Sequence, residues 1–106
     1  MLVLFDQGTP VPLRHLLQGH VVSTAYELGW SALKNGELLQ LAEASGFEVL
    51  VTTDSNLKYQ QNLSSRKIAI VVLSTTSWPR IKGASDKISA AFGESTVGSY
   101  LEVTIP

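Results

Sequence analysis

The chain has 106 residues, a formal net charge of −1 and no cysteine. This length suits one domain, and the lack of cysteine excludes a disulfide framework, a thiolate metal site and a cysteine nucleophile. A nearly neutral chain gives no sign of a nucleic-acid or membrane-surface binder by charge alone. Charged residues make up only 16% of the chain, which predicts extensive burial or pairing with another chain.

The N-terminal third begins with an apolar run at residues 2–5, which predicts a buried strand. Thr9 followed by Pro10 predicts the N-cap and first position of a helix, and Gly19 is placed to end that helix. A short strand is expected at residues 20–23.

The middle third centres on residues 49–51, an unbroken run of β-branched and apolar residues. Such a run is typical of a parallel strand that is buried on both faces, and we expect this strand to span residues 48–52. Asn35 predicts the N-cap of the helix before this strand, and Gly46 closes that helix. Residues 55–63 predict a weak polar helix or an ordered loop.

The C-terminal third contains the most strand-like run of the chain, at residues 68–73. One further helix is expected after it, ended by Gly93, with an apolar inner face formed by Ile81, Ile88, Ala91 and Phe92. Polar and apolar residues alternate over 100–105, which predicts a half-exposed strand at the edge of a sheet, near residues 100–104.

Strict alternation of strands and helices predicts a three-layer α/β fold. Its centre is expected to be a mostly parallel five-stranded sheet with helices on both faces, and residues 1–106 are expected to form one domain. The longest apolar run is too short to cross a bilayer, and the chain opens on a strand without a signal-peptide pattern. We therefore expect a cytoplasmic protein that has no membrane partner.

Three carboxylates form the candidate site. Asp6 and Asp54 directly follow the apolar runs at 2–5 and 49–51, so both are expected at the carboxyl edge of one sheet, where α/β proteins bind ligands. Neighbouring or next-but-one strands lie about 5 to 10 Å apart, which is close enough for both to contact one ion. Glu37 begins the adjacent predicted helix. Converging carboxylates repel one another unless a cation lies between them, and oxygen ligands favour Mg²⁺ or Mn²⁺.

Each of these carboxylates also has a purely structural interpretation. Asp54 is placed to cap the helix that follows it, and Glu37 is placed to complement a helix N-terminus. Asp6 is placed to hold a turn through its own side chain. The sequence leaves the catalytic and the structural interpretations open.

The chain resembles a known family, the small bacterial PIN-like proteins of the PIN-domain nuclease and toxin superfamily. The resemblance rests on four short segments that occur in the family's order and cover most of the chain. Residues 6–10 resemble "DENLP", residues 18–22 resemble "GHDV", residues 35–39 resemble "D-x-E-I-L", and residues 51–57 resemble "VTTDKDF".

This resemblance implies a parallel α/β sheet and a Mg²⁺-dependent ribonuclease, often the toxin of a toxin–antitoxin pair. By the same resemblance, Asp6, Glu37 and Asp54 would be catalytic residues and metal ligands, with Asn56 as a further ligand. Gln7 and Asn56 stand where the family has acids, and Asn35 or Gly36 stands in place of its aspartate. Each replacement removes negative charge from the metal site.

Three functions remain open at this stage. The first is a metal-dependent ribonuclease with an RNA substrate and an antitoxin-like partner. The second is a catalytically degenerate PIN-like module that binds a protein or RNA without cutting it. The third is a receiver-like phosphoacceptor domain, with Asp54 after the third strand as the phosphorylated residue. The alternating last strand and the low charge also predict a homodimer.

Overall fold

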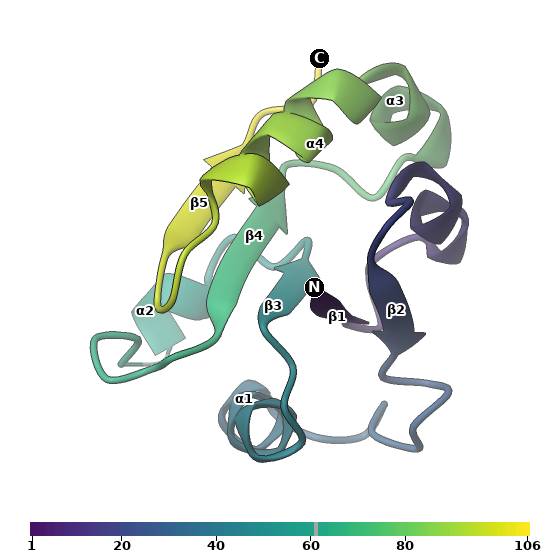
Figure 1. Ribbon diagram of the computed structural model, residues 1–106. Helices are drawn as coiled ribbons and strands as arrows, with labels where there is room; N and C mark the ends of the chain where they lie inside the picture. Colours follow the sequence, from purple (N-terminus) through teal and green to yellow (C-terminus); the bar gives the residue numbers. More distant parts are fainter. Residues whose placement is uncertain (61) are drawn as a thin grey trace.

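The computed structural model describes residues 1–60 and 62–106, and its helices and strands alternate along the chain (Figure 1). A short 3₁₀ helix, η1, follows the first strand, and the last two strands are separated by two α-helices. In chain order the elements are β1 (Leu2–Phe5), η1 (Val11–Leu16), β2 (Val21–Thr24), α1 (Asn35–Ala44), β3 (Val49–Thr52), α2 (Leu57–Gln60), β4 (Ala69–Leu73), α3 (Trp78–Gly83), α4 (Ser85–Glu94) and β5 (Tyr100–Val103).

The five strands form one sheet in the order β2-β1-β3-β4-β5, and every neighbouring pair is parallel. This is a doubly wound order, in which the chain first builds outward from β1 to β2 and then returns to add β3, β4 and β5 on the other side. The predicted fold class is therefore confirmed.

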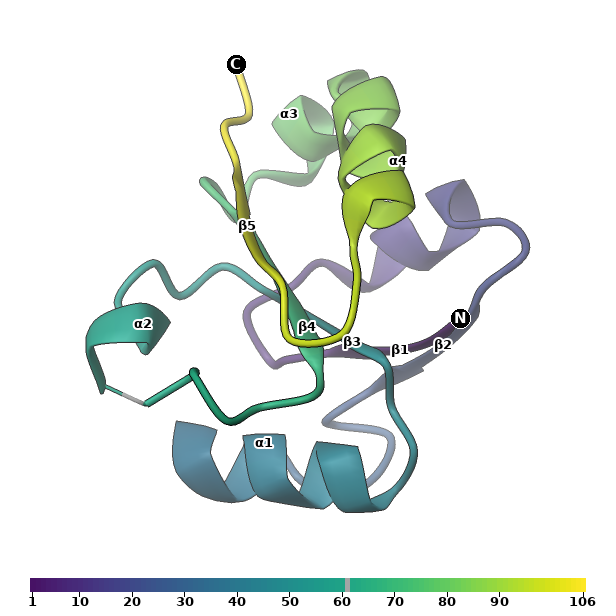
Figure 2. The same cartoon turned by 60° about the vertical axis from the view of Figure 1, so that its left-hand side comes forward.

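Helices cover both faces of the sheet, so the fold has three layers (Figure 2). On one face, η1, α3 and α4 pack over Val3, Phe5, Val51 and Val71. On the other face, α1 and α2 pack over Leu4, Leu50, Ile70 and Val72. Alternate residues of each central strand therefore enter two separate cores, as the period of two along a strand requires.

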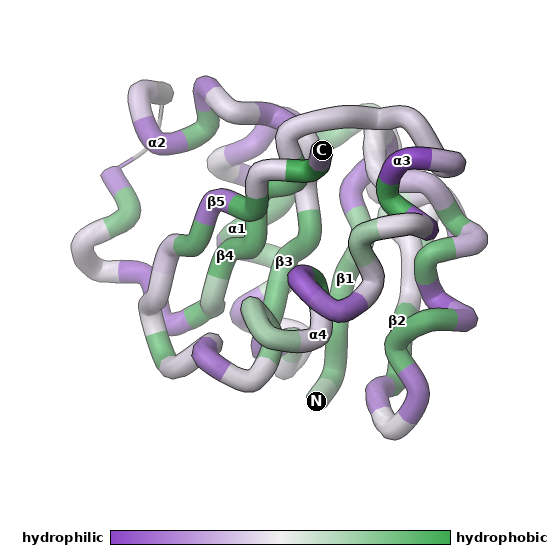
Figure 3. Tube along the Cα trace, turned by 90° about the horizontal axis from the view of Figure 1, so that it is seen from above, coloured by the Kyte–Doolittle hydropathy of each residue, from purple (hydrophilic) through white to green (hydrophobic). Residues whose placement is uncertain are grey.

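The three central strands account for the continuous apolar runs in the sequence. All residues of β3 and β4 are buried, and only Leu2 of β1 is partly exposed. In Figure 3 the hydrophobic segments of β1, β3 and β4 lie in the middle of the molecule. The predicted burial of these strands is confirmed, and β5 is an edge strand as the alternating pattern predicted.

The predicted helix boundaries need corrections. Pro10, not Thr9, is the N-cap of the first helix, which is a short 3₁₀ helix that ends at Leu16. Thr9 is buried and bonds inside the site described below. Lys34, not Asn35, is the N-cap of α1.

The last predicted helix is two helices, because Ala84 has φ −112° and ψ 24°, outside the helical range, between α3 and α4. Its four predicted inner residues are nevertheless all buried. Gly93 does not end the second of these helices, which continues to Glu94. None of the helices formed by residues 1–60 and 62–106 has the length and apolar character needed to cross a bilayer.

Candidate functional site

The candidate site lies where β1 and β3 end beside each other. The chain leaves β1 toward η1 on one face of the sheet and leaves β3 toward α2 on the other face. In doubly wound sheets this divergence opens a crevice at the carboxyl edge, where ligands bind. Asp6 is the residue after β1, and Asp54 lies two residues after β3, so both flank this position.

Asp6 is held by three donors of its own chain. The Gly8 backbone N–H donates to its Oδ1 over 3.1 Å, and the Thr9 hydroxyl lies 2.8 Å from the same oxygen. The Thr52 hydroxyl donates to its Oδ2. The Asp6 carboxylate thus joins its own turn to the end of β3, and the predicted turn-holding role of Asp6 is confirmed.

Hydrogen bonds within the chain also hold the carboxylate of Asp54. Its Oδ1 accepts the Asn56 backbone N–H over 2.9 Å, and its Oδ2 accepts the side-chain amide of Asn35 over 3.1 Å. Its own backbone N–H donates to the Thr52 hydroxyl oxygen over 3.1 Å. Thr52 therefore links the two aspartates, since it donates to one and accepts from the other.

The turn after Asp6 packs tightly against this link. A Cβ atom on Gly8 would lie 2.7 Å from Oγ1 of Thr53, so a larger residue there would displace that side chain. The Thr9 hydroxyl also lies 2.9 Å from the carbonyl oxygen of Val51, in a buried position. The segment Asp6 to Thr9 is consequently fixed against β3 by side chains at both of its ends.

The pKa of Asp6 is raised above its ordinary value of 3.8. Burial is the main cause, and the negative charge of Asp54 adds to it, while the hydrogen bonds from Thr52, Thr9 and Gly8 act in the opposite direction. Removal of the Asp6 carboxylate from water therefore contributes more to this raised pKa than repulsion from Asp54 does.

The structure places Glu37 elsewhere. Leu38, Leu39 and Ala42 of α1 are buried, whereas Glu37 is exposed and lines a separate cavity of about 340 Å³ with Gln40 and Leu41. Residues three and four apart share one face of an α-helix, so Glu37 lies on the face of Gln40 and Leu41, whereas Asn35 lies on the face of the buried Leu38 and Leu39. Asn35 is the residue of α1 that reaches Asp54. Among the described residues, no three Asp, Glu, His or Cys side chains gather as a group that could hold a metal ion.

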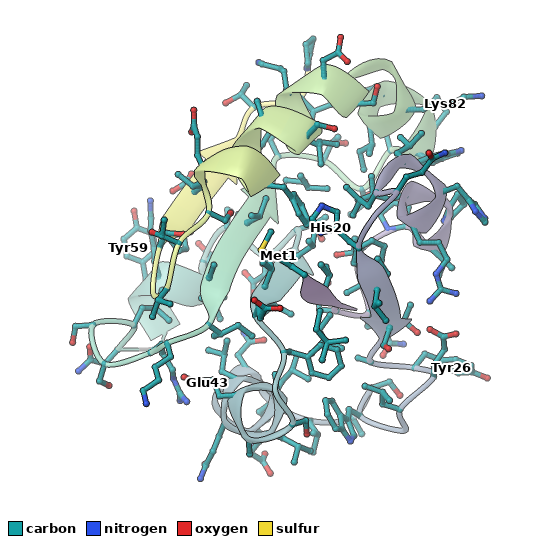
Figure 4. All side chains as sticks on the ribbon, viewed as in Figure 1. Met1, His20, Tyr26, Glu43, Tyr59 and Lys82 are labelled. Carbon is teal, nitrogen blue, oxygen red and sulfur yellow. The ribbon has the colours of Figure 1, made fainter. Side chains whose placement is uncertain are left out.

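A cavity of about 380 Å³ adjoins Asp6 on the side of β2. Its walls combine hydroxyl, amide and carboxylate groups with two exposed apolar side chains, and they comprise Asp6, Gln7, Thr9, Val11, Thr24, Tyr26 and Glu27. Tyr26 is 78% exposed and points outward beyond the end of β2 (Figure 4). Arg14 bonds Glu27 over 2.6 Å and is the main reason that the Glu27 pKa is lowered to about 2.

The donor set suits a hydrated divalent ion. Asp6 and Asp54 offer carboxylate oxygens, Asn56 offers an exposed amide, and none of these is a soft ligand. Among the described residues, Asp6 Oδ2 and both oxygens of Asp54 each accept one hydrogen bond, which leaves each oxygen a lone pair. Mg²⁺ commonly binds through one or two carboxylates and retains several waters. The two aspartates offer donors of this kind, whereas the predicted set of three carboxylates is not brought together among the described residues.

Thr52 and Asn35 are part of the site but were not among the predicted site residues. A hydroxyl at the last position of a buried strand, two residues before an aspartate, was the available signal for Thr52. The sequence predicts a helix cap at Asn35, whereas its side chain donates to Asp54 in the structure.

Comparison with family models, curated proteins and solved structures finds no match to this chain. The fold and the site describe a doubly wound α/β domain with two aspartates, linked through Thr52, at its β1/β3 switch point.

Proposed function

We propose that residues 1–106 form a PIN-like domain that hydrolyses RNA with Mg²⁺ or Mn²⁺ bound by Asp6 and Asp54. The observation that carries this proposal is the link through Thr52, which joins both aspartates at the β1/β3 switch point. Phosphodiester hydrolysis needs a group that stabilises charge on the phosphate and activates water, and a divalent ion supplies both.

In this proposal the chain's own residues position the ion and the RNA. Asp6 and Asp54 would hold the ion, with the exposed Asn56 as an additional oxygen donor. Thr52, Thr9 and Asn35 would fix the two carboxylates in place through the hydrogen bonds described above. The cavity beside Asp6 offers the Tyr26 ring to an unstacked base, which is how single-stranded RNA is commonly bound.

A degenerate PIN-like module that binds a protein or RNA without cutting is the second candidate. It is favoured by the position of Glu37 on the exposed side of α1 and by the neutral residues Gln7 and Asn56 beside the aspartates. With less negative charge, the site would attract a divalent ion more weakly.

A receiver-like phosphoacceptor is the third candidate, favoured by the strand order, which receiver domains share. Asp54 would be the phosphorylated residue, although Asn56 and Asn35 already donate to both of its oxygens. Incubation with acetyl phosphate followed by mass spectrometry tests this function, since a phosphorylated Asp54 would replace the ribonuclease proposal.

Calorimetry with Mn²⁺ and a cleavage assay on labelled single-stranded RNA test the main proposal. We expect the wild type to bind Mn²⁺ and cut the RNA. Asp54→Asn should lose both activities and keep or raise its melting temperature, because relief of repulsion offsets the weaker hydrogen bonds. Asp86→Asn, on the exposed first turn of α4, is the matched control and should behave as wild type.

Equal Mn²⁺ heats for wild type and Asp54→Asn would contradict the proposed metal site. RNA binding without cleavage by the wild type would instead favour the degenerate module. In this proposal the protein acts on RNA in the cytoplasm and binds an antitoxin-like partner there. A pull-down with the tagged full chain tests for that partner.

A further inference from the structure

The two edges of the sheet differ in how their outward backbone groups are satisfied. In a parallel strand, the N–H and C=O of one residue point to the same side, and successive residues alternate between sides. Val21 and Ala25 donate to β1, so Val22 and Thr24 of β2 point away from the sheet. Ser99 and Val103 bond to β4, so Tyr100 and Glu102 of β5 point away from it.

The β2 edge is covered by its own chain. Arg14 donates to the carbonyl oxygen of Val22 over 3.0 Å, and Glu27 accepts the Thr24 N–H over 2.9 Å. The Leu28 N–H donates to the carbonyl oxygen of Thr24 over 3.2 Å. An ion pair and a turn thus occupy this edge, and of the outward groups on Val22 and Thr24 only the Val22 N–H is left without a partner among the described residues. Charged side chains and coverage are common ways to prevent edge-to-edge pairing.

In the part of the chain that the structure describes, the β5 edge has no such cover. Within residues 1–60 and 62–106, nothing bonds to the outward N–H and C=O groups of Tyr100 and Glu102. The Lys58–Glu102 ion pair, at 2.6 Å, involves the Glu102 side chain and leaves its backbone open. An extended strand with this row of free groups is a template for another strand.

We propose that two copies of this chain pair through β5, antiparallel across a two-fold axis, and so join their sheets into one. The alternation of outward groups restricts the register to those that place outward residues opposite each other. The register that pairs both outward residues of each β5 places Tyr100 of one copy opposite the partner's Glu102, exchanging both backbone hydrogen bonds, and Leu101 then faces the partner's Leu101 at the axis. The same surface serves both copies, as a two-fold interface requires.

This dimer is independent of the proposed ribonuclease activity. The candidate site lies at the carboxyl ends of β1 and β3, whereas the proposed interface is the lateral edge of β5 (Figure 1). Antiparallel pairing points the two carboxyl edges in opposite directions, so each copy would keep its own site.

Sedimentation equilibrium over a series of micromolar concentrations tests the interface. We expect a wild-type dimer, weakened by Glu102→Pro, which removes an outward N–H without touching a bond to β4. The loss of two backbone hydrogen bonds per dimer should raise the dissociation constant roughly five- to a hundredfold. Glu102→Ala keeps that N–H and should have a smaller effect. Val22→Pro removes the outward N–H of β2 and should leave the dimer intact.

Amide hydrogen exchange of the wild type provides a second test without substitution. The N–H groups of Tyr100 and Glu102 should become protected as concentration rises. A monomer at every concentration, or equal effects of Glu102→Pro and Val22→Pro, would overturn the interface. Failure of this test leaves the metal and cleavage measurements on Asp54→Asn unaffected.

Discussion

At the residue scale, one hydroxyl organises the candidate site. Thr52 is 1% exposed, and it both donates to Asp6 and accepts from the backbone of Asp54. A hydroxyl can fill both roles because it carries one proton and two lone pairs. The two aspartates therefore keep a fixed relation through a residue that carries no charge itself.

Thr52→Val should destabilise the fold by about 1 to 3 kcal/mol, because the isosteric valine leaves a buried carboxylate oxygen and the Asp54 N–H with one fewer partner. Urea denaturation measures this change in the free energy of unfolding. Thr104→Val is the control, since Thr104 is exposed and its side chain makes no bond with the described residues. It should change the unfolding free energy by no more than about 0.5 kcal/mol. Equal effects of the two substitutions would contradict the linking role of Thr52.

The raised pKa of Asp6 makes stability depend on pH. The folded state holds the Asp6 proton more tightly than the unfolded state, whose pKa is near 3.8. Stability attributable to Asp6 is therefore greatest below that value and falls as pH rises through 3.8 to the raised folded pKa, above which it stays constant. Asp6→Asn cannot ionise and should lack this decline.

Denaturant unfolding of wild type and Asp6→Asn from acidic to neutral pH measures the effect. As pH rises above 3.8, the unfolding free energy of the wild type should fall relative to that of Asp6→Asn. Asp86→Asn controls for the removal of one negative charge. A difference that stays constant with pH would show that Asp6 has the same pKa in both states.

At the element scale, local backbone geometry decides where helices end. Pro10 and Pro12 flank the start of η1, and the chain there forms a short 3₁₀ helix instead of the longer α-helix expected up to Gly19. Gly19 does adopt φ +86°, a conformation that glycine favours, so it ends the turn that follows. The pattern of apolar residues identified the helix face correctly, but not the type of helix.

Two glycines near α4 should respond oppositely to alanine. Gly93 lies inside the helix and has no atom within 4 Å of an added Cβ, so Gly93→Ala should stabilise the protein by about 0.5 to 1 kcal/mol. Gly98 has φ +74°, and an added Cβ would lie 2.8 Å from the carbonyl oxygen of Arg66. Gly98→Ala should therefore destabilise it by about 1 to 3 kcal/mol. Thermal unfolding measures both, and effects of the same sign would contradict this account.

At the scale of the whole molecule, the boundaries of the sheet differ. Helices cover its faces, Arg14 and Glu27 cover its β2 edge, and the described residues leave its β5 edge and carboxyl end available. The radius of gyration of 12.4 Å agrees with the roughly 13 Å expected for one folded domain of this length. The carboxyl end offers a place for a ligand, and the β5 edge offers a place for a second copy.

The sequence alone determined the strands, their burial and the parallel α/β class. These properties follow from local patterns, since a strand buried on both faces is apolar throughout and the half-exposed strand β5 alternates. The positions of Asp6 and Asp54 at one edge of the sheet followed from the same patterns, because parallel strands all end on the same side.

Only the tertiary structure decided which residues meet at that edge. Asn35, not Glu37, reaches Asp54, because the rotation of α1 is set by packing Leu38, Leu39 and Ala42 against the sheet. Thr52 joins the two aspartates because β1 and β3 are neighbours, a pairing between residues 46 positions apart. Contacts between side chains of this kind depend on the strand order and on the rotation of helices about their axes, and no local pattern in the sequence specifies either.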